Sequence, residues 1–225
     1  MTWDDFTLAF FSLDILRQAW PILLSGLVQT LLLSAMVVPL GLAGGVALAL
    51  LSTARSPWVR WPLMAWVDVF RSLPPLVLLV FVYAGLPFAG LEVSPWGAVA
   101  IGFFLNTGAY YGEILRAGIE SVPAGQVEAA RSTGLSRGQA MAWVVLPQAL
   151  RITVPPLTNR TIAITKNTAL ASVVAVPEIL GAAQAGVSFG FNPTPLTLGA
   201  AAYLVLFLPV VVLGRWVETR FAWKR

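Results

Sequence analysis

The sequence contains no cysteine and no histidine among its 225 residues. Disulfide frameworks, metal sites built from thiolate or imidazole ligands, and catalysis by a thiol or an imidazole are therefore excluded. Charged residues are also scarce: they make up 11% of the chain, whereas soluble domains carry roughly a quarter. The composition thus excludes an ordinary soluble domain.

Hydrophobic residues dominate what is present. They account for 58% of the chain, and the mean hydropathy is +0.81. Several uncharged runs approach or exceed the roughly 20 residues that a helix needs to cross a bilayer. The sequence therefore predicts an all-α, polytopic membrane protein.

Five hydrophobic segments predict five transmembrane helices. The first two cover residues 23–51 and 63–86, and Pro74-Pro75 is expected to kink the second. The third covers residues 96–115, the fourth begins near Ile152 and ends at Pro177, and the fifth covers 196–213. Residues 178–188 are expected to form a short surface helix that Glu178 caps, without a role in transport.

The basic residues predict the orientation in the membrane. They follow the first, third and fifth segments and are absent after the second and fourth: Arg55, Arg60; Arg116, Arg131, Arg137, Arg151; Arg215, Arg220, Lys224, Arg225. Because lysine and arginine concentrate in cytoplasmic loops, we expect an outside N-terminus and a cytoplasmic C-terminus. The net charge of +4 then reflects topology and not a nucleic-acid surface.

The cytoplasmic segment of about residues 119–148 carries signals for two short helices. Pro123 suits a first turn, and Gly134 suits a left-handed end of that helix. Ser136 and Gln139 form a capping box for a second helix, which Pro147 is expected to stop. Small residues in this bracket permit close approach of another protein. The alternative is a loop that only connects two spans.

A spaced motif in this segment resembles a known family. Glu128-Ala129-Ala130, then Gly134, then Val144 and Leu146-Pro147 are similar to the cytoplasmic signature of ATP-binding-cassette (ABC) importer permeases. Four further stretches resemble the polar amino acid uptake family: FRSLPPLVLLVFVYAGLP, NTGAYYGEILRAGIESVPAGQ, LPQALRITVPPLTN and KNTALASVVAVPE. The resemblance extends from about Gly26 to Arg215.

The resemblance implies one permease domain over residues 1–225, with a core of about 20–218 and the type I ABC importer permease fold. It implies a multi-pass subunit of the bacterial cytoplasmic (inner) membrane that works by alternating access. The implied partners are a cytoplasmic ABC ATPase dimer, a second identical or homologous permease, and an extracytoplasmic binding protein that delivers a polar or charged amino acid. The implied ATPase-docking residues are Glu128, Ala129, Ala130, Gly134, Leu146 and Pro147.

The chain has no phosphate-binding GxxxxGK[ST] motif. We therefore expect it to be a transport subunit and not an enzyme, with no cofactor of its own and with ATP and Mg²⁺ on the partner ATPase. Two alternatives are a permease for an opine or an amino acid derivative, and a transporter that works without ATP.

Ionisable groups within spans need a reason, because each costs roughly 2.5–3.5 kcal/mol on insertion scales. One explanation is inner-half ion pairs, such as Arg71 or Arg160 with Glu113; Asp68 also lies in this zone. The other is that some of these groups line the translocation path.

Lys166 is the path candidate at the greatest depth, and its charge favours an anionic group such as a carboxylate. The members of the family often have aspartate at the next position, where this chain has Asn167, which argues against a cationic substrate. The other path candidates are Thr168, Asn106, Tyr110, Arg71 and Glu113. For Asn106 and Tyr110, hydrogen bonding between helices is the alternative.

Overall fold

The computed structural model describes residues 2–54 and 56–221, and every regular element in this part is a helix. This confirms the predicted all-α class. The α-helices are α1 (Trp3–Phe10), α2 (Leu13–Ser52), α3 (Pro57–Ser72), α4 (Pro75–Val80), α5 (Pro95–Glu120), α6 (Ala124–Ser132), α7 (Arg137–Ala140), α8 (Leu146–Asn167), α9 (Ile179–Gly190) and α10 (Thr194–Phe221). The others are π-helical turns at Phe81–Gly85 and Met141–Val145, and 3₁₀-helices at Leu86–Ala89 and Thr168–Val174.

The chain forms two compact units. The first comprises Met1–Val38, Pro74–Phe103 and Ala163–Val211; the second comprises Pro39–Leu73, Phe104–Ile162 and Val212–Arg225. The single permease domain over residues 1–225 stays a prediction.

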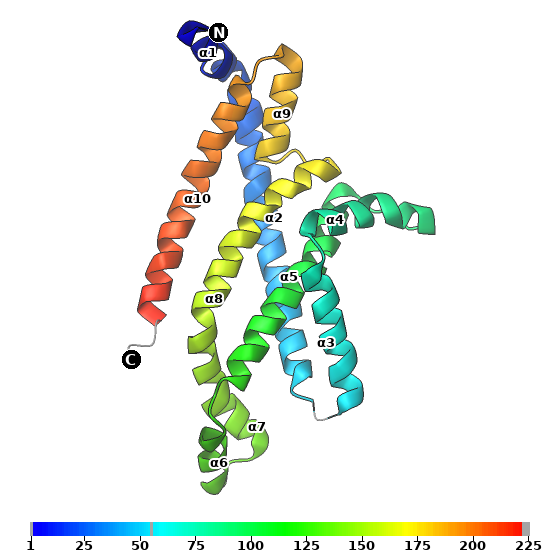
Figure 1. Ribbon diagram of the computed structural model, residues 1–225, viewed down its shortest axis with the longest axis vertical. Helices are drawn as coiled ribbons and strands as arrows, with labels where there is room; N and C mark the ends of the chain where they lie inside the picture. The colour runs from blue at the N-terminus through cyan, green and yellow to red at the C-terminus, as the bar shows by residue number, and fades with distance from the viewer. Residues whose placement is uncertain (1, 55, 222–225) are drawn as a thin grey trace. The chain divides into compact units, whose positions relative to one another are not determined.

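In the first unit, the start of α2 packs against α9 and α10 (Figure 1). The shared core contains Ala19 and Leu23 of α2 and Ile179, Ala182 and Ala183 of α9. A Cβ at Gly26 would lie 2.8 Å from the Cβ of Ala182, so the absence of a side chain lets the two helices approach closely.

In the second unit, the end of α2 packs closely against α5. A Cβ at Gly41 would lie 2.2 Å from a methyl carbon of Thr107, and one at Gly45 would lie 2.5 Å from the Cβ of Tyr111. The glycines of α2 therefore form a smooth face against which α5 lies. This contact positions the polar face of α5 toward α3 and α8, where the site described below is built.

Two described helical stretches are long and apolar enough to cross a membrane: Trp3–Ser52, which joins α1 and α2, and Thr194–Phe221. The number rises to four if each of two bent pairs forms one span, namely Pro57–Ser72 with Pro75–Ala89 and Arg137–Val174 with Ile179–Ser188. The predicted third span coincides with α5, which has 26 residues but is not in this set. The five-span count and the orientation stay predictions, and Arg55, Lys224 and Arg225 lie outside the described residues.

The predicted second span is divided more completely than by a kink. α3 ends at Ser72 and α4 begins at Pro75, and Pro74 has an extended ψ of 134°. Two consecutive prolines supply no N–H to the preceding turn, and each disfavours the helical conformation in the residue before it. The helix therefore stops and restarts.

The prediction that Pro147 ends a helix, and that the next begins near Ile152, is wrong. The chain is helical without interruption from Arg137 to Val174, and Met141–Val145 forms a π-helical turn just before Pro147. A π turn pairs residues five apart, so the local hydrogen bonding can accommodate a residue without an N–H. The helical run ends at Ala175, whose φ is 61°, two residues before the predicted stop at Pro177.

Candidate functional site

The bracket between α5 and α8, formed by α6 and α7, has most of the predicted local structure (Figure 1). Gly134 follows α6 with a φ of 91°, as the left-handed end requires. The capping box is present: the Gln139 N–H donates to Ser136 Oγ over 3.3 Å, and the Ser136 N–H donates to Gln139 Oε1 over 2.8 Å. Pro123 is the residue before the helix and not a member of its first turn.

A small apolar core holds this bracket against the two long helices. Val122, Val145 and Ala149 are buried together, and Val127 of α6 and Met141 pack against them. Because Val145 and Ala149 lie on the continuous run that becomes α8, α6 is attached directly to that helix. The segment is therefore a folded unit and not a loose connection.

The predicted docking residues do not share one face. Glu128, Ala129, Gly134 and Pro147 are exposed, Leu146 is half-buried, and Ala130 is buried. A Cβ added at Gly134 would meet nothing within 4 Å. The exposed surface of the bracket is thus free of steric obstruction by the described residues around Gly134.

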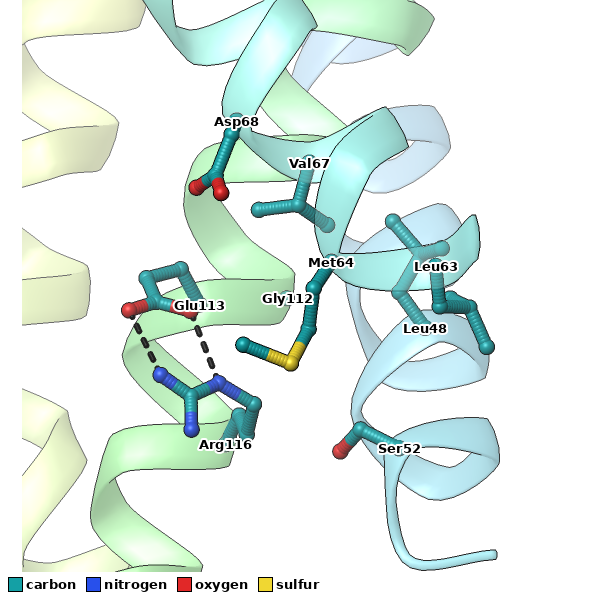
Figure 2. Close-up of a pocket in the computed structure, with 9 residues that line it drawn as sticks. All are labelled: Leu48, Ser52, Leu63, Met64, Val67, Asp68, Gly112, Glu113 and Arg116. Atoms are coloured by element: carbon teal, nitrogen blue, oxygen red, sulfur yellow. Dashed lines mark hydrogen bonds and ion pairs between the residues drawn. The ribbon is translucent and has the colours of Figure 1, made fainter. Parts of the chain in front are cut away.

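Glu113 of α5 is the centre of a charged cluster in the second unit. Arg116 donates to both of its carboxylate oxygens over 2.8 Å, as Figure 2 shows. Arg71 of α3 lies 3.4 Å away, and Arg116 also donates to Glu120 over 2.6 Å. The ion pair between Arg71 and Glu113 is confirmed. Sequence reasoning missed Arg116, although its spacing of three residues from Glu113 is the signal for a same-face helical pair.

A pocket beside this cluster is lined by α2, α3 and α5 of the second unit. Asp68 and Glu113 contribute carboxylates to its wall, and Figure 2 shows Met64 and Val67 beside them. Asp68 is exposed, and within the described residues it forms no ion pair with an arginine.

Asn106 and Tyr110 of α5 bind the free end of α3. The Asn106 Nδ2 donates to the carbonyls of Phe70 and Leu73 over 2.9 and 3.3 Å, and the Tyr110 hydroxyl donates to the carbonyl of Arg71 over 3.1 Å. The last carbonyls of a helix have no partner within it, and lipid offers none. Hydrogen bonding between elements, the alternative for both residues, is therefore confirmed, and their place in a path stays a prediction.

Arg160 of α8 does not pair with Glu113. Its guanidinium carbon lies 3.3 Å from the centre of the Tyr110 ring, and its Nη2 donates to Asn106 Oδ1 over 3.3 Å. The guanidinium carbon of Arg71 lies 5.5 Å from the same ring centre. The second unit thus brings Asn106, Tyr110, Arg71 and Glu113 together, and adds Arg160.

Lys166, Asn167 and Thr168 belong to the first unit. Lys166 is exposed at the end of α8 and has no carboxylate partner within the described residues. Asn167 is half-buried, and the buried Thr168 donates to the carbonyl of Thr165 over 2.6 Å. Their contact with a substrate stays a prediction.

Glu178 caps α9, as predicted. Its Oε1 accepts from the N–H of Gly181 over 2.9 Å, and its Oε2 accepts from the hydroxyl of Tyr203 over 2.5 Å. The side chain is fully buried. Sequence reasoning missed Tyr203, because no local spacing connects two residues on different helices.

A comparison with protein families gives the decisive observation. The family described as "binding-protein-dependent transport system inner membrane component" matches residues 41–223. The chain belongs to this family. The permease is 35% identical over 214 residues to the probable amino-acid ABC transporter permease protein YckA of Bacillus subtilis (strain 168), and the match covers 94% of each chain.

Two further matches extend the comparison. The permease is 35% identical over 216 residues to the octopine transport system permease protein OccM of Rhizobium radiobacter, covering 90% of this chain and 87% of the relative. It also resembles the chain in a crystal structure of an amino acid ABC transporter with histidines, with a TM-score of 0.85 and 32% identity over 91% of this chain and 96% of that one. The resemblance seen in the sequence is confirmed: the chain is a multi-pass ABC transporter permease, a transport subunit and not an enzyme.

Proposed function

We propose that this permease is the transmembrane subunit of an ATP-driven importer that moves a polar or charged amino acid by alternating access. The observation that carries the proposal is the bracket: two capped short helices, exposed on one side and attached on the other to α8. A carrier driven by an ion gradient has no need of such an element. We propose that the bracket docks on a cytoplasmic ABC ATPase dimer, which binds ATP and Mg²⁺.

The geometry provides a route from the motor to the transport path within the second unit. Force applied to α6 reaches Val145 and Ala149 through the small core beneath it. Those two residues lie on the same uninterrupted helical run as Arg160. A movement of the bracket would therefore displace a helix that carries a charged group of the central cluster.

The proposed assembly has the remaining parts implied by the family. A second permease, identical or homologous, completes the path, and an extracytoplasmic binding protein delivers the amino acid. In this arrangement five spans cross the bacterial inner membrane, with the N-terminus outside. Lys166, Asn167 and Thr168 are proposed to contact the cargo, and the exposed ammonium of Lys166, which pairs with no carboxylate of the described residues, suits an anionic group of the cargo.

A related cargo is the second candidate. One relative at 35% identity is named an octopine permease, and an opine is an amino acid derivative that keeps a carboxylate. The same path could therefore carry an opine.

Reconstitution tests the proposal. Proteoliposomes would contain this permease, its ATPase and its binding protein, and uptake of the twenty radiolabelled amino acids and of octopine would be measured. We expect ATP-dependent uptake of at least one polar amino acid, and none without the ATPase. Uptake that continues when the ATPase is left out would refute the ATP-driven mechanism, and uptake of octopine alone would establish the second candidate.

A further inference from the structure

Arg160 is a cation without a counter-charge. Within the described part of the chain, no carboxylate lies within ion-pair distance of it. Its Nε is buried and has no hydrogen-bond partner. Charged groups in membrane helices are costly, and an unpaired one marks a functional site by default. The ring of Tyr110 and the amide of Asn106 hold the guanidinium without neutralising it.

The guanidinium group of Arg71 likewise has an N–H group without a hydrogen-bond partner. Its Nε is also buried without a partner. Its carboxylate, Glu113, lies 3.4 Å away but is held more closely by Arg116, at 2.8 Å. Arg71 and Arg160 lie against one aromatic ring, so their positive charges are near neighbours. Two guanidinium groups therefore face this ring, while the one carboxylate beside Arg71 is shared with Arg116, so these groups together carry a net positive charge.

We propose that Arg160 and Arg71 together bind the α-carboxylate of the transported amino acid through the accessible N–H groups of their half-buried guanidinium groups. This assignment rests on the proposed function and deepens it. A guanidinium presents N–H donors in a plane that matches a carboxylate, and such charge-assisted bonds are stronger than neutral ones. The sequence favoured Lys166 for contact with a carboxylate, named Arg71 as a path candidate, and left Arg160 between an ion pair with Glu113 and a place along the path.

The surrounding contacts fix the geometry of this subsite before cargo arrives. Both amide hydrogens of Asn106 are directed to carbonyls at the end of α3, so its Oδ1 is left to accept from Arg160. The Tyr110 ring is fixed by the bond from its hydroxyl to the carbonyl of Arg71. A binding group held in place in this way loses little entropy when the ligand binds.

The proposed subsite binds the α-carboxylate, a group that all amino acids share. It would therefore contribute affinity for the backbone of the cargo without choosing among side chains. An amino acid whose carboxylate is converted to a neutral amide should lose this contribution and keep every other contact.

The test measures that difference directly on the permease–ATPase complex in lipid nanodiscs, without ATP and without the binding protein. Calorimetry would give the dissociation constant of each of the twenty amino acids that binds, and of its α-amide. In the wild type we expect the amide to bind at least about tenfold more weakly, as for the loss of one strong polar contact. In Arg160→Gln we expect the amino acid to bind more weakly, so that its dissociation constant is about equal to that of its α-amide.

Two further variants serve as comparisons. Arg151→Gln removes an exposed arginine of the same helix and should leave the ratio at its wild-type value. Arg160→Lys keeps the charge but loses the planar fork, and should give an intermediate ratio. If Arg160→Gln does not assemble with the ATPase, Arg71→Gln takes its place with the same expected direction.

Three outcomes would overturn the assignment. One is a wild-type ratio of the two dissociation constants near one, because the carboxylate would then contribute nothing to binding. Another is an unchanged ratio in Arg160→Gln, even with weaker binding of both ligands, because the residue would then be structural. The last is equal loss in Arg151→Gln. None of them affects the proposed function, which stands or falls on ATP-dependent uptake by the wild-type proteoliposomes.

Discussion

Glu178, which caps α9 in the first unit, and Glu113 of α5 in the second unit are both acidic residues, and their carboxylates are satisfied in opposite ways. Neutral donors surround Glu178: the hydroxyl of Tyr203 and the N–H of Gly181. Glu113 is held by the cations Arg116 and Arg71. Glu178 is fully buried, whereas the side chain of Glu113 is 26% exposed. The hydrogen bonds of Glu178 fix the start of α9, whereas the arrangement around Glu113 leaves positive charge on the neighbouring arginines available to a ligand.

The difference indicates a division of labour. Substitutions around Glu178 should lower stability, because hydrogen bonds would be lost in a closed environment. Substitutions around Glu113 and in the bracket of α6 and α7 should lower transport at nearly unchanged stability. Each prediction below tests one side of this contrast.

Gly134→Asp should have the largest effect. Aspartate tolerates a positive φ better than most residues, and the added side chain enters open space, so the bracket should remain folded. The new negative charge on the proposed docking surface should abolish association with the ATPase while insertion into the membrane stays normal. Co-purification of the ATPase measures it. The matched variant is Gly90→Asp, which also has a positive φ and open space around it but lies outside the bracket, and it should leave co-purification unchanged. Undiminished co-purification would count against docking through α6.

Glu178→Ala should follow in size. It removes a helix cap and leaves the hydroxyl of the half-buried Tyr203 without its acceptor, and the two losses should cost about 2–4 kcal/mol. Thermal unfolding of the purified permease in nanodiscs would show it as a lower midpoint. Glu178→Gln keeps an acceptor oxygen and should lose clearly less. Equal midpoints for the two variants would show that Glu178 is held by charge after all.

Glu113→Gln should reduce ATP-dependent uptake by roughly tenfold, equivalent to about 1.4 kcal/mol in the transport barrier. Removing this charge leaves Arg71 without its carboxylate partner, next to Arg160, so the two arginines should retain a bound carboxylate longer and release it more slowly. Stability should fall by less than about 1 kcal/mol, because partly exposed ion pairs contribute little and Arg116 keeps Glu120. A large drop in the unfolding midpoint would make Glu113 the structural equivalent of Glu178.

Tyr203→Phe should have the smallest effect. It removes one donor to Glu178 and leaves the bond from Gly181 in place, so about 1–2 kcal/mol of stability should be lost. Uptake at low temperature should match the wild type. Reduced uptake with a normal unfolding midpoint would assign Glu178 a part in transport and contradict its purely structural role.

Local signals predicted the ends of three helices correctly. The ends at Gly134, the capping box of Ser136 and Gln139, and the cap at Glu178 each depend on residues within four positions, and all three are present. Proline was less reliable as a signal. Pro74-Pro75 breaks the helix, whereas Pro147 does not, because the π turn before it changes the hydrogen-bond pattern.

The site was only partly predictable, because its contacts connect distant segments. The sequence indicates that Arg71, Glu113 and Arg160 need partners, but not that Arg160 takes the ring of Tyr110 while Arg71 takes the carboxylate. The hydrogen bonds of Asn106 likewise depend on where α3 ends. Such pairings are settled by helix packing, which no local spacing encodes.

The π-helical turn at Met141–Val145 determines how far α7 is rotated about the helix axis relative to α8. One residue advances an α-helix by about 100°, so a single residue more or fewer in this turn would rotate α7 around the axis of α8 by roughly a quarter of a circle or more. The direction in which the bracket faces is therefore encoded in the length of the chain as well as in its side chains. A one-residue deletion here would keep every functional group and still turn the proposed docking surface in a different direction.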